Sequence, residues 1–222
     1  MAAPLRHTRF ELNPHATLPA APHLTPAELT DGIRRLSQSD LVSFVRAYVQ
    51  ERTPAAFSGK PLLWESARVW LSDRCGVHPR EIGLSGSAQL GYSIVKAKNW
   101  TPFNPRQSDL DLFVVSPSQY EVVAAEARRF VAMNESNPRY VNQVRTTENL
   151  LRRCWVDVKH IPADHDRYPK AANLKNDASI LIDRLKLHDF DLKPSSFRIY
   201  SSWQALSVWT RLSYRHLGAE AA

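Results

Sequence analysis

The fold is decided by residues 82–116, which read IGLSGSAQLGYSIVKAKNWTPFNPRQSDLDLFVVS. This stretch opens with a short apolar run, turns at Ser-Gly-Ser over residues 85–87 and closes with a second apolar run over residues 110–115. Because side chains alternate across a strand, Asp109 and Asp111 are predicted to share one face. We therefore expect two strands linked through a glycine turn, with a pair of carboxylates at the start of the second strand.

The carboxylate pair and the turn together indicate a site for a metal-bound phosphate. Two neighbouring carboxylates repel each other unless a cation lies between them. Mg²⁺ suits this position because it binds one or two carboxylates together with substrate phosphates. Gly86 and Ser87 in the preceding turn can offer backbone N–H groups and a hydroxyl to phosphate oxygens.

A third carboxylate lies in residues 154–161, which we expect to form a strand with Trp155, Asp157 and Lys159 on one face. Burying Asp157 between valines is costly without a partner, so a salt bridge, an exposed edge strand and a metal ligand are alternatives. Taken alone, Asp157 favours the salt bridge, whereas the turn and the carboxylate pair favour the metal ligand. Lys159 either meets a triphosphate or pairs with Asp157.

These features resemble the signature of DNA polymerase β-like nucleotidyltransferases, and residues 57–116 are similar to small stand-alone bacterial members. The resemblance spans residues 57–161 and is carried by Gly86-Ser87, Gly91, Ser108-Asp109-Leu110-Asp111-Leu112 and the later strand with Asp157. It implies an α+β fold of the polymerase β-like palm type, a mixed sheet with flanking helices. The spacing of 22 residues between Ser87 and Asp109 is longer than in many members, and residues 96–106 are therefore expected to form a surface loop at the mouth of the site.

The resemblance also implies an enzyme that attacks the α-phosphate of a nucleoside triphosphate with the help of Mg²⁺, or of Mn²⁺ in its place. Asp109, Asp111 and Asp157 would be its catalytic residues and metal ligands. The residues expected to bind the nucleotide are Gly86, Ser87, Ser108 and Lys159.

The acceptor is left open between an RNA end, a protein and a small molecule. The resemblance also implies a toxin–antitoxin or phage-defence setting, to which bacterial relatives of this size often belong, and some members of the superfamily make nucleotide second messengers. A non-catalytic nucleotide- or RNA-binding module on the same fold is the alternative from another class. A phosphohydrolase metal site built from His160, His165-Asp166 and His188-Asp189 is a weaker rival, because further ligands at helical spacing are lacking.

Composition agrees with a partner that carries negative charge. The 222 residues have a formal net charge of +7 and a pI of about 9.6, which favours nucleotides, RNA or another polyanion. Cys75 and Cys154 are the only cysteines, and their spacing predicts neither a zinc site nor a disulfide. With no signal peptide and no run near ~18 apolar residues, we expect a cytoplasmic protein without membrane contact.

Four segments are expected along the chain. Residues 1–24, rich in proline, are predicted to be a poorly ordered arm. Residues 25–56 form a helical segment, beginning with Thr25 as helix cap. Residues 57–161 form the nucleotidyltransferase core, and residues 162–222 form a C-terminal α/β extension packed on it. In that extension we expect a polar loop up to a helix capped by Asn176 or Asp177, then a strand over residues 196–200.

Overall fold

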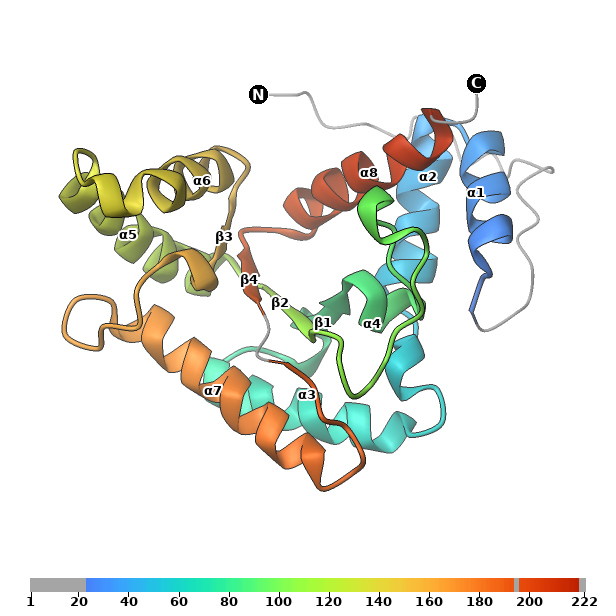
Figure 1. Ribbon diagram of the computed structural model, residues 1–222, viewed down its shortest axis with the longest axis horizontal. Coiled ribbons are helices and arrows are strands. Elements are labelled where there is room, and N and C mark those ends of the chain that lie inside the picture. Colours follow the sequence, from blue (N-terminus) through green and yellow to red (C-terminus); the bar gives the residue numbers. More distant parts are fainter. Residues whose placement is uncertain (1–22, 194–195, 220–222) are drawn as a thin grey trace.

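The computed structural model describes residues 23–193 and 196–219, so most of the expected N-terminal arm lies outside the described residues. The chain is α+β, with a four-stranded mixed sheet flanked by helices (Figure 1). Its strands are β1 (Ile82–Ser85), β2 (Asp111–Val115), β3 (Trp155–Asp157) and β4 (Phe197–Tyr200). The helices are α1 (Pro26–Arg35), α2 (Gln38–Val45), α3 (Pro61–Cys75), α4 (Gly86–Leu90), α5 (Pro117–Asn134), α6 (Val141–Arg152), α7 (Pro169–Lys186) and α8 (Trp203–Ala219).

The strands lie in the order β1-β2-β4-β3. β1 pairs antiparallel with β2, β2 pairs parallel with β4, and β4 pairs antiparallel with β3. A strand is present at Phe197–Tyr200, within the residues expected to form one, and it lies in the middle of the sheet. The sheet therefore includes a strand from beyond Ile161, because β4 lies between β2 and β3.

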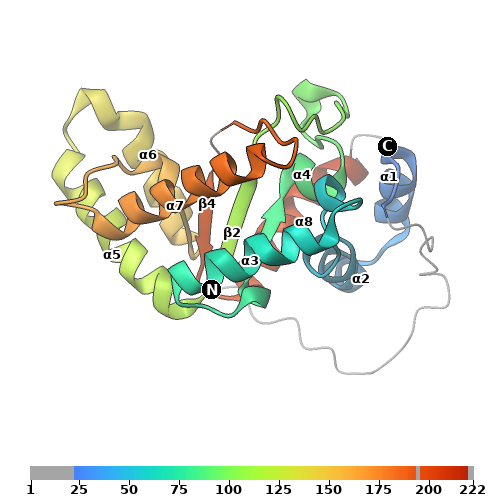
Figure 2. The ribbon, with the colours of Figure 1, turned by 90° about the horizontal axis from the view of Figure 1, so that it is seen from below.

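The two faces of the sheet pack against different helices. Alternate residues of the four strands, among them Leu84, Leu112, Val156 and Ile199, belong to a core shared with α3, α5 and α7. Figure 2 shows α3 and α7 side by side over the sheet. On the opposite face α8 covers a second apolar cluster, formed by Phe113, Val115, Trp155, Tyr200 and Leu206.

The helical N-terminal segment packs beside α8. Thr25 caps α1 as expected, because its hydroxyl accepts the Glu28 N–H and the Glu28 carboxylate accepts the Thr25 N–H at 2.8 Å. α1 and α2 then form a third apolar cluster with Tyr92 and with Tyr214 of α8. α2 continues as a π-helical turn, Arg46–Gln50.

One helix begins earlier than expected. α7 starts at Pro169, so the prediction of a polar loop ending at a cap on Asn176 or Asp177 is wrong. The carboxylate of Glu126 on α5 accepts the N–H groups of Lys170 and Ala171, each at 2.9 Å. The cap of α7 therefore comes from a distant helix. Asp177 lies inside α7, where it pairs with Arg74 at 2.5 Å.

Among the residues that the structure describes, no helix has the length and apolar character needed to cross a bilayer.

Candidate functional site

A row of polar side chains crosses the sheet on the face that also carries the α8 cluster. Each strand contributes one member: Ser85 from β1, Asp111 from β2, Arg198 from β4 and Asp157 from β3. Strand alternation places these side chains on the same face as Phe113, Tyr200 and Trp155. The face is therefore apolar under α8 and polar where β1 runs into α4.

Arg198 joins the members of this row, and the sequence analysis missed it. Its Nη1 donates to Ser85 Oγ at 2.9 Å and its Nη2 donates to Asp111 Oδ1 at 3.3 Å. Its Nε lies 3.6 Å from Asp157 Oδ2, which is an ion-pair distance but too long for a hydrogen bond. This Nε is buried and has no hydrogen-bond partner.

The charge of Arg198 is stabilised by its surroundings. Burial lowers the pKa of Arg198, but the negative charges around it, led by Asp111, more than offset burial and raise that pKa. Its side chain is 18% exposed, so the charge lies largely inside the protein. An arginine in a central strand, flanked by Phe197 and Ile199, is the one sequence signal that could have pointed to buried carboxylate partners.

Asp111 and Asp157 share a face of the sheet but do not come from adjoining strands. β4 lies between β2 and β3, so the two Cα atoms are about 10 Å apart at the usual spacing of strands. Asp111 and Asp157 therefore do not converge from neighbouring strands. The guanidinium of Arg198 occupies the position between them.

Asp157 is buried and paired with cations. Its side chain is 2% exposed, its Oδ2 lies 3.2 Å from Lys159 Nζ, and its Oδ1 accepts the Lys159 N–H at 3.1 Å. Of the three alternatives for Asp157, the structure contains the salt bridge. β3 ends at Asp157 because a 3₁₀ turn, Val158–His160, follows it. Lys159 is thus not a strand residue, and it meets Asp157 through this turn.

The glycine turn lies next to Asp111. Gly86 has a φ of +67° and begins α4 directly after β1. A Cβ at this position would lie 2.6 Å from Asp111 Oδ2, so only glycine lets the backbone come this close. Ser196 Oγ donates to the other oxygen, Oδ1, at 2.7 Å. Asp111 is thus held by neighbours on both sides.

Asp109 lies before β2 and is exposed. Its backbone forms an isolated parallel bridge with Lys193, and a tight turn follows in which Leu112 N–H donates to Leu110 O at 3.1 Å. Leu110 and Leu112, on either side of Asp111, are both buried in the same core, as strand alternation requires, and the shared face of Asp109 and Asp111 stays a prediction.

Ser87 and Ser108 each take part in the local structure of their own segment. Ser108 Oγ accepts the Asn104 N–H at 2.9 Å and so closes the loop that precedes β2. Ser87 is in the first turn of α4, and its carbonyl accepts the Gly91 N–H at 2.8 Å.

The donor set of this region suits one hard cation better than two. Within the described ranges, no group of three or more His, Cys, Asp or Glu residues could hold a metal ion. This holds for the three carboxylates and also for the histidine–aspartate doublets. A Mg²⁺ ion needs only one or two protein carboxylates when substrate phosphates complete its shell, and Asp111 Oδ2 beside Gly86 together with exposed Asp109 would supply them. Asp157, which is 2% exposed and paired with both Lys159 and Arg198, is less open to a metal than Asp111, whose contacts with Arg198 and Ser196 are both made through Oδ1.

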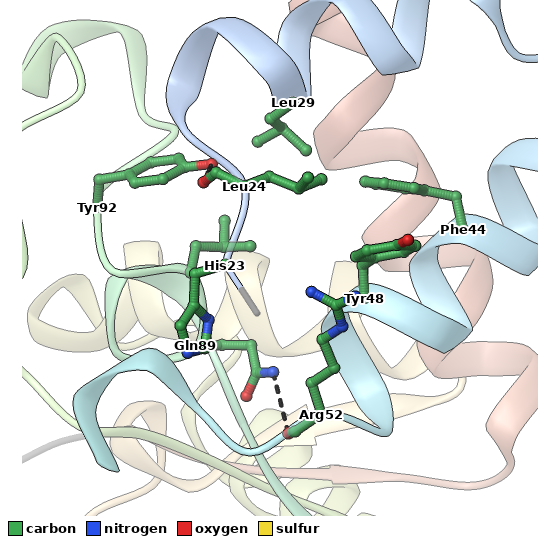
Figure 3. Close-up of a pocket in the computed structure, with 9 residues that line it drawn as sticks. His23, Leu24, Leu29, Phe44, Tyr48, Arg52, Gln89 and Tyr92 are labelled. Atoms are coloured by element: carbon green, nitrogen blue, oxygen red, sulfur yellow. Dashed lines mark hydrogen bonds between the residues drawn. The ribbon is translucent and has the colours of Figure 1, made fainter. Parts of the chain in front are cut away.

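The described residues also enclose two hollows of very different size. A cavity of about 10 Å³ below the N-terminal helices holds roughly one water molecule, and Figure 3 shows His23, Tyr48, Arg52, Gln89 and Tyr92 around it. A cleft of about 870 Å³ lies along the edge strand β1. Of these two, the cleft, which sequence reasoning did not foresee, has the size of a ligand site.

Comparison of the chain with protein-family models, with curated proteins and with solved structures finds no match.

Proposed function

We propose that the protein is a metal-dependent nucleotidyltransferase, which moves a nucleoside monophosphate from a nucleoside triphosphate onto a hydroxyl-bearing acceptor. The observation that supports this best is the glycine turn against Asp111, with Gly86 placed so close to Oδ2 that a side chain there would clash. A backbone turn beside a carboxylate allows a phosphate and its cation to be bound together.

Each residue of the region has a role in this proposal. Asp109 and Asp111 hold Mg²⁺, or Mn²⁺ in its place. When bound, the ion neutralises phosphate charge and orients the reacting groups. Gly86 and Ser87 offer the backbone N–H groups and the hydroxyl of their turn to phosphate oxygens. Ser108 keeps the preceding loop closed so that Asp109 stays near Asp111.

In this proposal the side chains of Arg198 and Lys159 attract the phosphates. Arg198 and Lys159 are held by Asp157, so in this proposal Asp157 orients positive charge instead of binding a second metal. The acceptor oxygen forms a bond to the α-phosphorus, and the bond between the α-phosphorus and the oxygen that bridges to the β-phosphate breaks. Pyrophosphate leaves, and the hydroxyl proton passes to water. Catalysis then consists of positioning and charge stabilisation, without a covalent enzyme intermediate.

The test is release of pyrophosphate from each nucleoside triphosphate with Mg²⁺ or Mn²⁺, in the presence of RNA, DNA or protein acceptors. Asp111→Asn is expected to lower the rate by about a hundredfold or more, because the ligand charge is lost. Asp73→Asn on the exposed face of α3 removes the same charge away from the site and should leave the rate unchanged. A folded Asp111→Asn variant with the wild-type rate would remove this residue from the mechanism.

One observation favours a second candidate, a protein on the same fold that binds nucleotides without transferring them. Asp157 is already neutralised by Lys159 and lies beside Arg198, and no three-carboxylate group exists among the described residues. Such a protein would bind nucleoside triphosphates and release no pyrophosphate with any acceptor. The assay above therefore separates the two candidates.

A further inference from the structure

The cleft along β1 has a basic lining. We call it the arginine cleft and define it by its lining residues from β1 (Ile82, Gly83, Leu84), from α3 and its start (Pro61, Leu62, Trp64, Glu65, Arg68), from the segment before α3 (Arg46, Gln50, Glu51, Arg52, Thr53, Pro54), and by Arg80, Gln89 and Trp203. Four arginines and two glutamates give this lining a formal charge of +2 (4 − 2). A negatively charged ligand is therefore favoured.

The four arginines differ in how they are held. Arg68 donates to Pro79 O at 3.0 Å and pairs with Glu65 at 3.1 Å. The guanidinium of Arg52 lies 3.8 Å from the ring centre of Tyr48. Arg46 and Arg80 are exposed, and neither has an ion-pair partner among the described residues. Two charges in the cleft are thus held in place by the protein, and two point to solvent.

The rim of the cleft also carries apolar side chains. Trp203, the first residue of α8, is 40% exposed, and Leu62 on α3 is 82% exposed. Exposed tryptophan beside arginines is the combination on which the bases of single-stranded nucleic acid stack while their phosphates are neutralised.

The edge strand at the base of the cleft does not favour an added peptide strand. A peptide that extends a sheet needs open main-chain groups on the edge strand. Ile82, Gly83 and Leu84 are all buried, although β1 is the outer strand. The cleft instead provides charged and aromatic contacts, which suit nucleic acid.

We propose that the arginine cleft binds single-stranded nucleic acid, with phosphates on Arg46 and Arg80 and a base stacked on Trp203. Residues 82–84 of the cleft lead directly into Ser85 and Gly86, beside Asp111. The bound strand is then the acceptor of the transfer reaction, and this assignment alone rests on the proposed function.

Binding is measured by fluorescence anisotropy with a labelled single-stranded RNA of about 12 nucleotides at a series of salt concentrations. The double variant Arg46→Ala/Arg80→Ala is expected to bind about tenfold more weakly at low salt. The slope of log K against log salt should become shallower by about 1.4, since each lost phosphate contact contributes about 0.7. Arg139→Ala/Arg145→Ala removes two exposed arginines on and beside α6, outside the cleft lining, and is the matched control.

Stacking is tested at Trp203. Trp203→Ala should weaken binding about tenfold, whereas Trp203→Phe, which keeps an aromatic ring, should stay within a few-fold of wild type. Thermal melts of both variants report whether the start of α8 is intact.

Four results would overturn the proposal. The first is a loss of binding in the control variant equal to that in Arg46→Ala/Arg80→Ala. The others are an affinity for duplex RNA equal to that for the single strand, an affinity for a poly-glutamate peptide equal to that for the single strand, and unchanged binding by folded Trp203→Ala.

The inference and the proposed function can fail separately. Asp111→Asn should bind the RNA as wild type does while releasing pyrophosphate more slowly by about a hundredfold or more. If the wild-type protein transfers a nucleotide but binds no single strand, the cleft assignment is wrong and the function stands. If it binds the strand through Arg46 and Arg80 but transfers a nucleotide from none of the nucleoside triphosphates tested, the function is wrong and the cleft assignment stands.

Discussion

At the scale of single residues, a cation and not a third carboxylate organises the polar row. Arg198 reaches Ser85, Asp111 and Asp157 from one strand, and each of these contacts lies within 3.6 Å. Removing one partner of a buried ion pair leaves the other charge uncompensated, which is much more costly than the pair itself is stabilising. The stability of this face should therefore depend strongly on Arg198.

Replacing Arg198 should destabilise the fold. Arg198→Met is expected to lower the free energy of unfolding by about 3 kcal/mol at neutral pH, because Asp111 and buried Asp157 lose their shared cation. Arg198→Lys keeps the charge but loses the forked geometry, so its loss should be smaller. Urea unfolding measures both values. Arg139→Met, at an exposed position, is the control and should change stability by less than about 0.5 kcal/mol.

A wild-type unfolding midpoint for Arg198→Met would contradict the bridging role of the guanidinium.

Sequence reasoning at this scale succeeded where a single local signal was enough. The glycine turn was expected near Asp111, and it lies there. The shared face of Asp109 and Asp111 stays a prediction, because Asp109 lies before β2 and is exposed. Arg198 was missed because its partners lie on three other strands.

At the scale of helices and strands, features with a local cause agree with the sequence-based expectations, whereas features with a distant cause do not. The start of α1 was expected, because Thr25 caps it from within its own segment, and α3 and α5 likewise have local caps in Gly76 and Ser116. The start of α7 was wrong because its cap, Glu126, lies more than 40 residues earlier in the chain. The position of β4 in the sheet also depends on long-range pairing.

The cap on α7 can be tested through Glu126. Its carboxylate is buried and accepts two N–H groups at the start of the helix. Glu126→Ala should lower the free energy of unfolding by about 2 kcal/mol, because two buried donors lose their acceptor. Glu126→Gln keeps one acceptor oxygen and should lose about half as much. Glu121→Ala, an exposed position of the same helix, is the control.

Unfolding is followed by circular dichroism in urea. Equal stability of Glu126→Ala and Glu121→Ala would show that α7 starts at Pro169 without help from α5.

At the scale of the whole molecule, burial of weak acids makes stability depend on alkaline pH. Burial raises the pKa of the Cys75 thiol to about 11, and it also raises the pKa of Tyr92, Tyr200 and Tyr214. The folded protein therefore keeps these protons at pH values where the unfolded chain has lost them. Stability is complete below about pH 8.5 and falls as the pH rises towards 11.

Each such group contributes up to about 1.4 kcal/mol per pH unit in this window. Urea midpoints measured between pH 8 and 11 should fall steadily, and Cys75→Ala should show a shallower fall because the thiol no longer titrates. Exposed Cys154 should react with a thiol reagent in the folded protein, whereas Cys75 should react only after unfolding. A flat profile up to pH 11 would contradict the burial of these groups.

The position of β4 also has a consequence for how the chain acquires its shape during translation. β2 and β3 are made long before β4, yet neither pairs with the other, and both need β4 between them. Until residue 200 has been synthesised, a nascent chain can form the β1–β2 hairpin but must leave two strand edges open. Such edges invite pairing with foreign strands. We expect the emerging chain to rely on a ribosome-associated chaperone until its last strand closes the gap.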